Sequence, residues 1–332
     1  MKIYRINWGK KLKTALICGI SGQDGTFLTD FLLKKNYRVV GTSRDAQVGH
    51  FGNLKKLNLF SHVELTSMAP NDFRSVLSVL KKYSPDEVYF LAGQSSVALS
   101  FDQPIETLES ITVGCLNILE AIRFLNLPTR LYNAGSSECF GDTMGNVSDL
   151  TTPFCPRSPY AVARCTAYWL TTNYRESYGL YACTGLLFNH ESYLRPERFV
   201  TQKIIASVVR ISKGSSEKLF LGNVNISRDW GWAPDYVEAM WLMLQNKKAE
   251  DFIICTGETH SLESFVKLAF GYFDLDYKKY LEINADFIRP NEILTSRGDA
   301  SLAYEKLGWR AETKFEEVIS KMIKYTLESA NY

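Results

Sequence analysis

The chain has 332 residues, of which 45% are hydrophobic, so it is long and apolar enough to bury a sizeable core. Its 38 Lys and Arg residues nearly balance its 36 Asp and Glu residues, which leaves a net charge of +2. This balance argues against nucleic acid or a membrane surface as the main partner, because both need a strong positive field. We expect a globular protein that binds its ligand locally.

The seven cysteines and four histidines bear on the cellular compartment and on metals. The cysteines are odd in number, widely spread and lack any C-x-x-C pair, so they fit neither a disulfide framework nor a zinc site. We expect reduced thiols in a cytoplasmic protein. The histidines lack the spacing of a metal-binding pair, and we expect no metal. The apolar stretch 15–20 is too short for a signal sequence or a membrane span.

Apolar runs alternate with helical periodicity through the first half of the chain. The pattern predicts strands over 14–19, 37–41, 87–92, 130–134 and 180–188, and helices over 24–35, 73–83, 107–125 and 160–178. Such alternation is typical of an α/β protein with a Rossmann-type, doubly wound parallel sheet.

The alternation stops near residue 190, where loops rich in Arg, Pro and Asn begin. We expect a Rossmann domain over 13–188, to which part of 224–260 returns. A smaller mixed α/β lobe, which binds the substrate, is expected over 189–223 and 261–330. The sequence contains no repeat or linker that would separate independent domains.

A glycine-rich turn joins the first predicted strand to the first predicted helix. It contains Gly19, Gly22 and Gly25, with two residues between each pair. The first glycine permits a tight turn, the second lets the backbone approach a pyrophosphate, and the third packs the helix against the strand. The phosphates would then meet the positive end of the helix. Glycines also mark ordinary turns, but the strand–turn–helix context favours a dinucleotide site.

Two residues at the end of the second predicted strand give opposite indications about the cofactor. Arg44 suits the 2′-phosphate of NADP, whereas Asp45 suits the 2′-hydroxyl of NAD. We favour NADP, because Arg44 can draw Asp45 aside or Asp45 can face water. NAD stays open on this pattern alone.

A tyrosine and an arginine share one face of the predicted helix 160–178. Tyr160 and Arg164 lie four residues apart, and the strand before this helix is followed by Ser136 and Glu138. A cation beside a phenol favours the phenolate, which can remove a hydroxyl proton during hydride transfer. On their own, the tyrosine and arginine are equally consistent with a surface pair on an amphipathic helix.

Together these residues resemble the extended short-chain dehydrogenase/reductase family, whose mark is Tyr-x-x-x-Lys after a Ser or Thr at the preceding strand end. The resemblance narrows to the GDP-mannose 4,6-dehydratases and runs from about Lys13 to Ile323. The segments that match, in the same order, are Gly19–Gly25, Leu91–Val97, Pro153–Ala163, Leu187–Ser192, Phe199–Lys203, Arg228–Gly231, Asp235–Val237, Thr256–His260 and Arg289–Pro290.

The resemblance implies a cytoplasmic enzyme that converts GDP-mannose to GDP-4-keto-6-deoxymannose and water by internal hydride transfer through bound NADP. It also implies a homodimer or homotetramer. Ser136 matches the residue that hydrogen-bonds the sugar's 4-hydroxyl, and Tyr160 matches its base, with Arg164 as helper. Glu138 matches the acid/base at carbons 5 and 6. Ser137 stands where dTDP-glucose dehydratases have an aspartate, which favours the GDP-mannose branch.

The resemblance further implies which residues bind the ligands. NADP contacts are expected from Gly19, Ser21, Gly22, Gln23, Asp24, Gly25, Arg44, Leu91, Ala92, Gly93, Tyr160, Arg164, Asn189 and His190. Substrate contacts are expected from Ser95, Ser136, Ser137, Glu138, Asn189, Lys203, Arg228, Arg289 and Glu292. Lys203, Arg228 and Arg289 could neutralise a diphosphate, and Glu292 could accept hydrogen bonds from guanine. Alternatively, these four residues are solvated surface charges.

The sequence departs from the family at several positions. Arg164 replaces the family's lysine, and its guanidinium is larger, planar and always charged. The stretch Arg44–Asn53 lacks the usual double arginine, which elsewhere can help to join subunits around NADP. Ser96 replaces a common histidine, and the loop that should lie near the hexose is altered at Tyr193, Leu194 and Pro196.

Three alternative functions stay open. A related substrate such as a GDP-heptose would fit the altered loop. A GDP-4-keto-6-deoxy-sugar reductase or an epimerase of the same fold would need no acid/base at carbon 5, so Glu138 distinguishes it from a dehydratase. A protein without activity that senses NADP or a nucleotide sugar is suggested by Arg164 alone.

Overall fold

The computed structural model describes residues 12–288 and 290–329, which form two compact units. The first unit comprises the described residues up to Cys139, together with Ser158–Leu186 and Val237–Phe252. The second comprises Phe140–Arg157, Leu187–Tyr236 and the described residues from Ile253 onward.

The division differs from the expected one at residues 140–157, which group with the second unit. The backbone explains the difference. The Ser148 amide donates to the Arg297 carbonyl at 2.8 Å, and the Asp299 amide donates back to the Ser148 carbonyl at 3.0 Å. These hydrogen bonds join two segments that are distant in sequence, so the hydrophobic periodicity of the sequence could not predict them.

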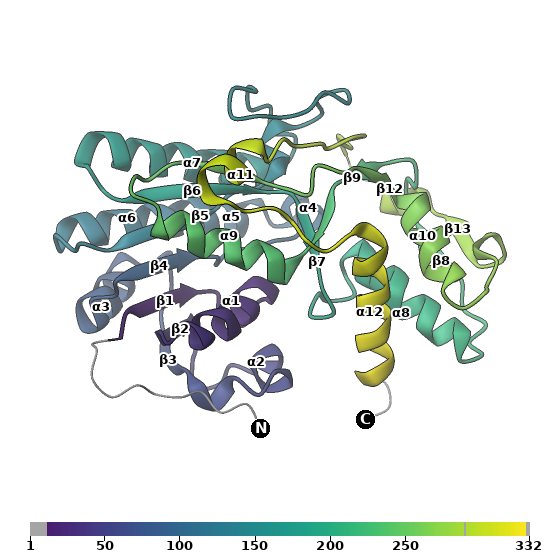
Figure 1. The fold of residues 1–332 in the computed structure, drawn as a ribbon, viewed down its shortest axis with the longest axis horizontal. Helices are drawn as coiled ribbons and strands as arrows, with labels where there is room; N and C mark the ends of the chain where they lie inside the picture. The colour runs from purple at the N-terminus through teal and green to yellow at the C-terminus, as the bar shows by residue number, and fades with distance from the viewer. Residues whose placement is uncertain (1–11, 289, 330–332) are drawn as a thin grey trace. The chain divides into compact units, whose positions relative to one another are not determined.

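A seven-stranded sheet has the order β11-β6-β5-β4-β1-β2-β3 (Figure 1). Its strands are β1 (Thr14–Cys18), β2 (Arg38–Ser43), β3 (Glu64–Ser67), β4 (Glu87–Phe90), β5 (Arg130–Ala134), β6 (Ala182–Leu187) and β11 (Phe252–Ile254). The pairs β3–β2, β2–β1, β1–β4, β4–β5 and β5–β6 are parallel. Every residue of β1, β4 and β6 is buried, as expected of apolar strands covered on both faces. The predicted Rossmann-type sheet is confirmed.

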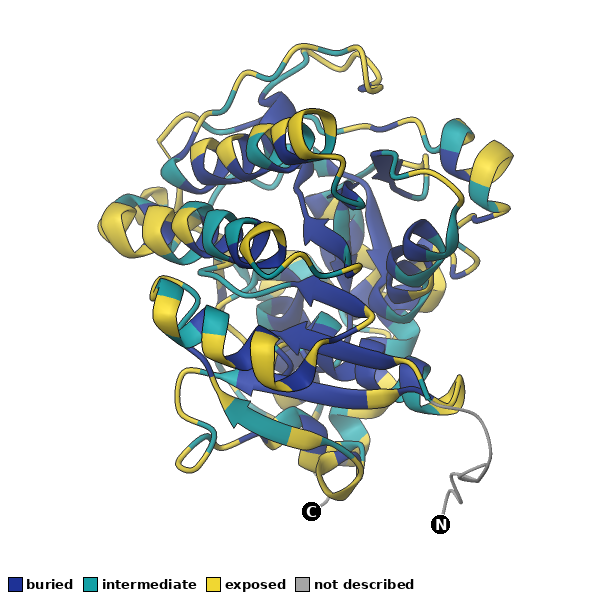
Figure 2. Cartoon of the chain, turned by 90° about the vertical axis from the view of Figure 1, so that its left-hand side faces the viewer, coloured by how far each residue is buried: buried dark blue, intermediate teal, exposed yellow. Residues whose placement is uncertain are grey.

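Helices of the first unit lie on both faces of this sheet. They are α1 (Gln23–Lys34), α2 (Gly52–Lys56), α3 (Phe73–Tyr83), α4 (Val97–Asp102), α5 (Pro104–Leu108), α6 (Gly114–Phe124), α7 (Pro159–Tyr178) and α9 (Ala233–Gln245), with a π-helical turn at Glu109–Val113 and a 3-10 turn at Phe60–His62. Helix α6 packs against α3 and α7, whereas α1 meets α9 through the rings of Phe31 and Trp241. Figure 2 shows buried strands beneath helices whose outer faces are exposed.

The second unit has its own apolar core. Its helices are α8 (Val200–Ser212), α10 (Leu262–Gly271), α11 (Ser301–Leu307) and α12 (Phe315–Ser329), and its paired strands are β7 (Asn189–Glu191) with β10 (Trp230–Trp232), β8 (Leu219–Leu221) with β13 (Leu281–Ile283), and β9 (Ser227–Arg228) with β12 (His260–Ser261). Helices α8, α10 and α12 pack on one another around Trp230, Phe265 and Phe315. This is the smaller mixed α/β lobe that the sequence suggested.

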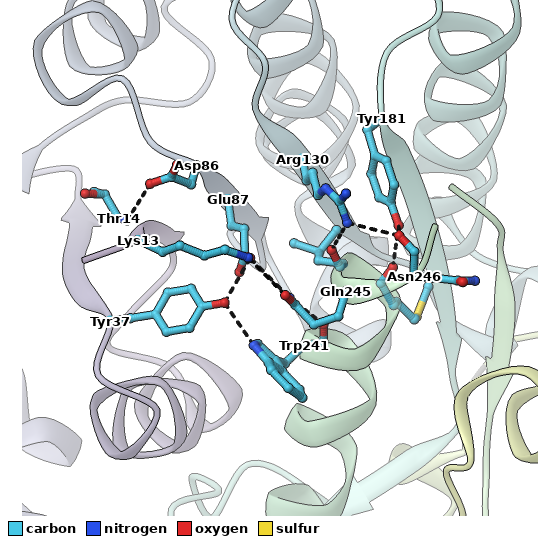
Figure 3. Close-up of polar contacts among 12 residues, drawn as sticks. Lys13, Thr14, Tyr37, Asp86, Glu87, Arg130, Tyr181, Trp241, Gln245 and Asn246 are labelled. Carbon is cyan, nitrogen blue, oxygen red and sulfur yellow. Dashed lines mark hydrogen bonds and ion pairs between the residues drawn. The ribbon is translucent and has the colours of Figure 1, made fainter. Parts of the chain in front are cut away.

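A buried glutamate fixes helix α9 at the amino end of the sheet (Figure 3). Glu87, the first residue of β4, is 1% exposed. Its Oε1 accepts hydrogen bonds from the Tyr37 hydroxyl at 3.0 Å and from Gln245 Nε2 at 3.1 Å, and lies 3.1 Å from Lys13 Nζ. Its Oε2 accepts from the Tyr89 hydroxyl at 2.8 Å. One carboxylate therefore joins segments far apart in sequence.

A second set of hydrogen bonds, near those of Glu87, holds the C-terminal end of α9. Arg130 Nη1 donates to the carbonyls of Leu244 and Asn246 at 2.6 and 3.0 Å. The Tyr181 hydroxyl contacts the carbonyls of Met243 and Asn246, each at 2.9 Å. These hydrogen bonds explain why part of 224–260 returns to the first unit.

Replacing Glu87 by Ala should lower the free energy of unfolding by about 3 kcal/mol, because it leaves buried hydroxyl and amide donors without an acceptor. Urea denaturation measures the change. The control is Glu106→Ala, which removes an exposed partner of Arg44 and should cost less than about 1 kcal/mol. Equal losses in the two variants would contradict the anchoring role of Glu87.

Candidate active site

The glycine turn after β1 has the geometry of a phosphate cradle. Gly19 has φ of +92°, and a Cβ there would lie 3.0 Å from the Ala92 amide nitrogen. A Cβ on Gly25 would lie 2.3 Å from the Gly19 carbonyl oxygen, so only glycine lets α1 approach β1 this closely. At Gly22, the N-cap of α1, a Cβ would meet no atom closer than 3.4 Å. The turn thus fits a pyrophosphate at the start of α1.

The other residues of this turn lie at the same helix start. The Ser21 carbonyl accepts a hydrogen bond from Asn53 Nδ2 at 3.1 Å. Gln23 Nε2 donates to Asp24 Oδ1 at 3.0 Å within the first turn of α1. The sequence therefore located this turn correctly, and the roles of these side chains toward a cofactor stay predictions.

The loop after β4 lies beside the glycine turn, where the strand order of the sheet reverses. Leu91 and Ala92 border Gly19, and Gly93 has φ of +127° with Ile111 packed against it. Ser95 is exposed in the same loop. In doubly wound sheets this reversal point is where dinucleotides bind, so the predicted Leu91–Gly93 segment is at the expected place.

Arg44 and Asp45, the two residues after β2 that gave opposite indications about the cofactor, have different environments. Asp45 Oδ1 accepts hydrogen bonds from the amides of Gln47 and Val48 at 2.8 and 3.1 Å, so this carboxylate caps its own turn. Arg44 is 79% exposed and lies 3.4 Å from Glu106. An exposed guanidinium with one surface partner can exchange that partner for a phosphate.

The segment after β5 holds the predicted acid/base. A Cβ on Gly135 would lie 2.9 Å from the Gly185 carbonyl oxygen, so the chain leaves the sheet in close contact with β6. A 3-10 turn, η3 (Ser137–Phe140), follows. The Ser136 hydroxyl accepts a hydrogen bond from the Glu138 amide at 3.2 Å. Ser136 and Ser137 are buried and Glu138 is half-buried.

Helix α7 begins one residue before the predicted base. Ser158 caps it by accepting a hydrogen bond from the Ala161 amide at 3.1 Å, and proline occupies the first helical position. Tyr160 is 9% exposed and belongs to the apolar core of the first unit. The guanidinium carbon of Arg164 lies 5.2 Å from the Tyr160 ring centroid. The i, i+4 pairing expected from the sequence is confirmed in the structure.

Arg164 joins α7 to the end of β5. It is 4% exposed, and its Nη1 donates to the Ala134 carbonyl at 2.6 Å. Its Nε is buried without a hydrogen-bond partner among the described residues. The next residue on α7, Cys165, lies with its Sγ 3.9 Å from the carbonyl of Cys139 in η3. These contacts bring the helix of Tyr160 against the segment of Ser136 and Glu138.

Two predicted nucleotide-binding residues of the second unit contact each other. Arg228 on β9 lies 3.6 Å from the Glu292 carboxylate, and its Nη1 donates to the Ser227 carbonyl at 2.9 Å. Lys203 on α8 donates to the Phe220 carbonyl at 2.7 Å, and its burial lowers the pKa of the ammonium. Arg289, the remaining predicted cation, lies outside the described residues.

Asn189 and His190 lie on β7, which pairs with β10. The His190 ring stacks on Tyr236 with centroids 4.5 Å apart, and its Nδ1 is 2.7 Å from the Phe188 carbonyl. Packing and a backbone contact therefore account for His190. The proposed cofactor contacts of Asn189 and His190 stay predictions.

Asp229 is a buried titratable residue that the sequence did not single out. It is 0% exposed, and its carboxylate accepts hydrogen bonds from the amides of Thr256 and Gly257 at 3.0 and 2.8 Å. Burial raises the pKa of Asp229 to about 6 despite these hydrogen bonds. The contact joins the matched segments Arg228–Gly231 and Thr256–His260, which no local pattern could have shown.

Comparison with known proteins agrees with this geometry. The chain shares its fold with solved structures. The dTDP-glucose 4,6-dehydratase DesIV from Streptomyces venezuelae, solved with NAD, superposes with a TM-score of 0.86 at 17% identity, covering 96% of this chain and 98% of that one. RMD from Pseudomonas aeruginosa, solved with NADPH, gives a TM-score of 0.80 at 20% identity, covering 96% and 99%.

The sequence comparisons are more specific. The profile of the family described as GDP-mannose 4,6 dehydratase matches residues 16–322. GDP-mannose 4,6 dehydratase 1 from Arabidopsis thaliana is 46% identical over 331 residues, which cover 97% of this chain and 91% of that protein. The chain therefore belongs to the GDP-mannose 4,6-dehydratase family.

No helix within 12–288 and 290–329 is long and apolar enough to cross a membrane. In the same part of the chain, no three His, Cys, Asp or Glu residues are grouped so that they could hold a metal ion.

The raised pKa of Asp229 predicts how stability depends on pH. The folded-state pKa of about 6 lies above the unfolded value, so protons bind the folded state more tightly and stability falls as the pH rises from about 4 through 6. One pKa unit equals about 1.4 kcal/mol, so the wild type should lose roughly 3 kcal/mol relative to Asp229→Asn between about pH 4 and pH 7. Urea denaturation across this range measures the difference, and parallel curves would refute the assignment.

Proposed function

We propose that the protein is an NADP-dependent lyase that converts GDP-D-mannose to GDP-4-keto-6-deoxy-D-mannose and water. The observation that supports this most is the Arg164–Ala134 contact of 2.6 Å, which holds the helix of Tyr160 against the segment that contains Ser136 and Glu138. Membership of the GDP-mannose 4,6-dehydratase family indicates which reaction the enzyme catalyses.

Oxidation of the sugar starts at its 4-hydroxyl. Ser136 would hydrogen-bond this hydroxyl while Tyr160 removes its proton. The Arg164 guanidinium lies near the Tyr160 ring, so a positive charge is close to the proposed base during this step. When bound, the nicotinamide cofactor would supply the chemistry that moves a hydride from carbon 4 to carbon 6; with a proton returned to carbon 5, the reaction has no net redox change.

Elimination of water requires two proton transfers, and in this scheme one group carries out both. The ketone at carbon 4 acidifies the neighbouring carbon 5 hydrogen, so Glu138 can remove that proton and then give it to the departing carbon 6 hydroxyl. Ser137 offers no second carboxylate, which supports a single acid/base. Because Glu138 is half-buried, it can be reached by a sugar while remaining held by the turn.

The residues that would hold the cofactor are those of the glycine turn, the loop Leu91–Gly93 and Arg44. The tight fit around Gly19 and Gly25 supports a pyrophosphate at the α1 start. The exposed Arg44 and the turn-capping role of Asp45 support NADP over NAD. We propose that NADP is recycled within the enzyme and is tightly bound.

The guanosine diphosphate part would be held by Asn189, Lys203, Arg228, Arg289 and Glu292. Lys203 and Arg228 are half-buried or buried cations that already bond backbone carbonyls, which positions them for a diphosphate. Glu292 beside Arg228 can accept from guanine. We also propose, from the family resemblance, a cytoplasmic homodimer or homotetramer.

Glu138→Gln should lower kcat for GDP-mannose at least about 100-fold, because the amide cannot shuttle a proton. Mass spectrometry of the nucleotide sugar shows the loss of one water. The matched variant Ser137→Ala should stay within about tenfold of the wild type, since Ser137 transfers no proton in this scheme. Full dehydratase activity in the Glu138 variant would exclude Glu138 as the acid/base.

Arg44→Ala should raise the Kd for NADPH at least about tenfold and change the Kd for NADH about twofold or less, because only the former has a 2′-phosphate. Nicotinamide fluorescence titration measures both constants. Arg74→Ala, which removes an exposed arginine of α3, is the control and should change neither. Equal weakening of both nucleotides would exclude Arg44 as a phosphate contact.

A further inference from the structure

Two buried polar atoms near the end of β5 have complementary hydrogen-bonding roles and no partner among the described residues. One is Arg164 Nε, an N–H donor, and the other is Asn133 Oδ1, a carbonyl acceptor. Arg164 is 4% exposed and Asn133 is fully buried. Burial without a hydrogen-bonding partner is costly for both atoms, so a donor and an acceptor in the same place are expected to be linked.

The contacts of the two side chains place them on the same face of the sheet. Asn133 directly precedes Ala134, whose carbonyl accepts a hydrogen bond from Arg164 Nη1 at 2.6 Å. Side chains alternate along a strand, so the Asn133 carboxamide lies on the same face as Leu131. Leu131 belongs to one apolar core with Ala163 of α7. Both unpaired atoms therefore lie between the end of β5 and α7.

The other buried side-chain atoms without a partner in the described part of the chain lie elsewhere. The Tyr132 hydroxyl is on the opposite face of the sheet, where its ring lies beside Tyr89. The remaining atoms belong to the second unit, on Gln202, Tyr236, Thr259 and His260. Within the described residues of the first unit, Asn133 and Arg164 are therefore the complementary pair on the α7 face.

We propose that Asn133 is a positioning residue for Arg164, and that its carbonyl oxygen holds the arginine Nε–H through one ordered water molecule. The two described side chains make no direct hydrogen bond at these atoms, and buried water commonly joins polar groups that would otherwise be unpaired. The effect of Asn133 on turnover rests on the proposed function, whereas the link itself does not.

The link gives the guanidinium a second fixed point. Asn133 Nδ2 donates to Thr184 Oγ1 at 3.2 Å, so the carboxamide is itself held by the neighbouring strand β6. Arg164 would then be held at Nη1 by the Ala134 carbonyl and at Nε by the water. Two hydrogen bonds from one planar group fix its orientation as well as its position. This orientation matters because the guanidinium carbon lies 5.2 Å from the Tyr160 ring centroid.

The link depends on a feature that arginine has and lysine lacks. Arginine carries the Nε–H donor at the place along its side chain where lysine carries a methylene group. The lysine that is usual in the family at position 164 would therefore have no donor for the water at that place. Asn133 should matter for turnover when position 164 is arginine, and much less when it is lysine.

A double-mutant cycle on the full-length protein with saturating NADP tests this dependence. Asn133→Leu should lower kcat for GDP-mannose about tenfold and change KM about twofold or less, because the guanidinium loses one fixed point. In protein that also carries Arg164→Lys, the same change should alter kcat about threefold or less. Asn133→Ala replaces the leucine variant if that variant does not fold. The control Thr171→Val removes a buried hydrogen bond of α7 two turns from Arg164, and should change kcat about twofold or less.

Equal losses from Asn133→Leu in the arginine and lysine backgrounds would overturn the inference. A crystal structure of the wild type gives a readout that is independent of activity: a water within about 3.2 Å of both Asn133 Oδ1 and Arg164 Nε is expected, and the lack of a shared water would also overturn the inference. A wild type that never dehydrates GDP-mannose refutes the proposed function, while the crystal structure still decides whether the link exists.

Discussion

The hydrogen bond from Arg164 to the Ala134 carbonyl is the contact on which the candidate site depends. It connects the second turn of α7 to the end of β5, and the two bonded residues are 30 positions apart in the sequence. The arginine is almost fully buried, so its charge needs a partner there, and a backbone carbonyl at the strand end supplies one. The same guanidinium lies near the Tyr160 ring. One side chain therefore fixes both the position of the proposed base and the electrostatics around it.

The contacts that stabilise the sheet and the residues of the candidate site lie at opposite ends of its strands. At the amino ends, the buried Glu87 and its donors hold α9 to β2 and β4. At the carboxyl ends, the turns after β1, β4 and β5 present the glycines, the loop beside them and the acid/base segment. Parallel strands allow this separation because all their carboxyl ends share one edge. Because these stabilising contacts lie at the amino ends of the strands, the turns at the carboxyl ends can have the residues that ligand binding requires.

Much of the first unit could be predicted because its strands are apolar runs and its helices are periodic. The exceptions have physical reasons. Strand β3 was not predicted, because Glu64–Ser67 is polar and lies at the sheet edge, where burial does not select apolar residues. Helices α2 and α4 are too short for periodicity to show. The predicted helix 107–125 is a continuous run of α5, a π-helical turn and α6.

Pairings across long sequence distances could not be predicted. The sequence marked Tyr160 and Arg164 by their spacing, and it placed Ser136 and Glu138 by resemblance. It gave no sign that Asp229 would hold the Thr256–Gly257 turn, or that the Cys165 thiol of α7 would lie against the Cys139 carbonyl of η3. Such contacts depend on how elements pack, and periodicity describes one element at a time.

The most direct test of the account is the turnover of Arg164 variants with GDP-mannose. Lysine in place of Arg164 keeps a positive charge near Tyr160 and a donor for the Ala134 carbonyl, so kcat should stay within about tenfold of the wild type. Methionine at this position has similar length without charge or donor, and it should lower kcat at least about 100-fold. A methionine variant with wild-type turnover would contradict the central role given to Arg164.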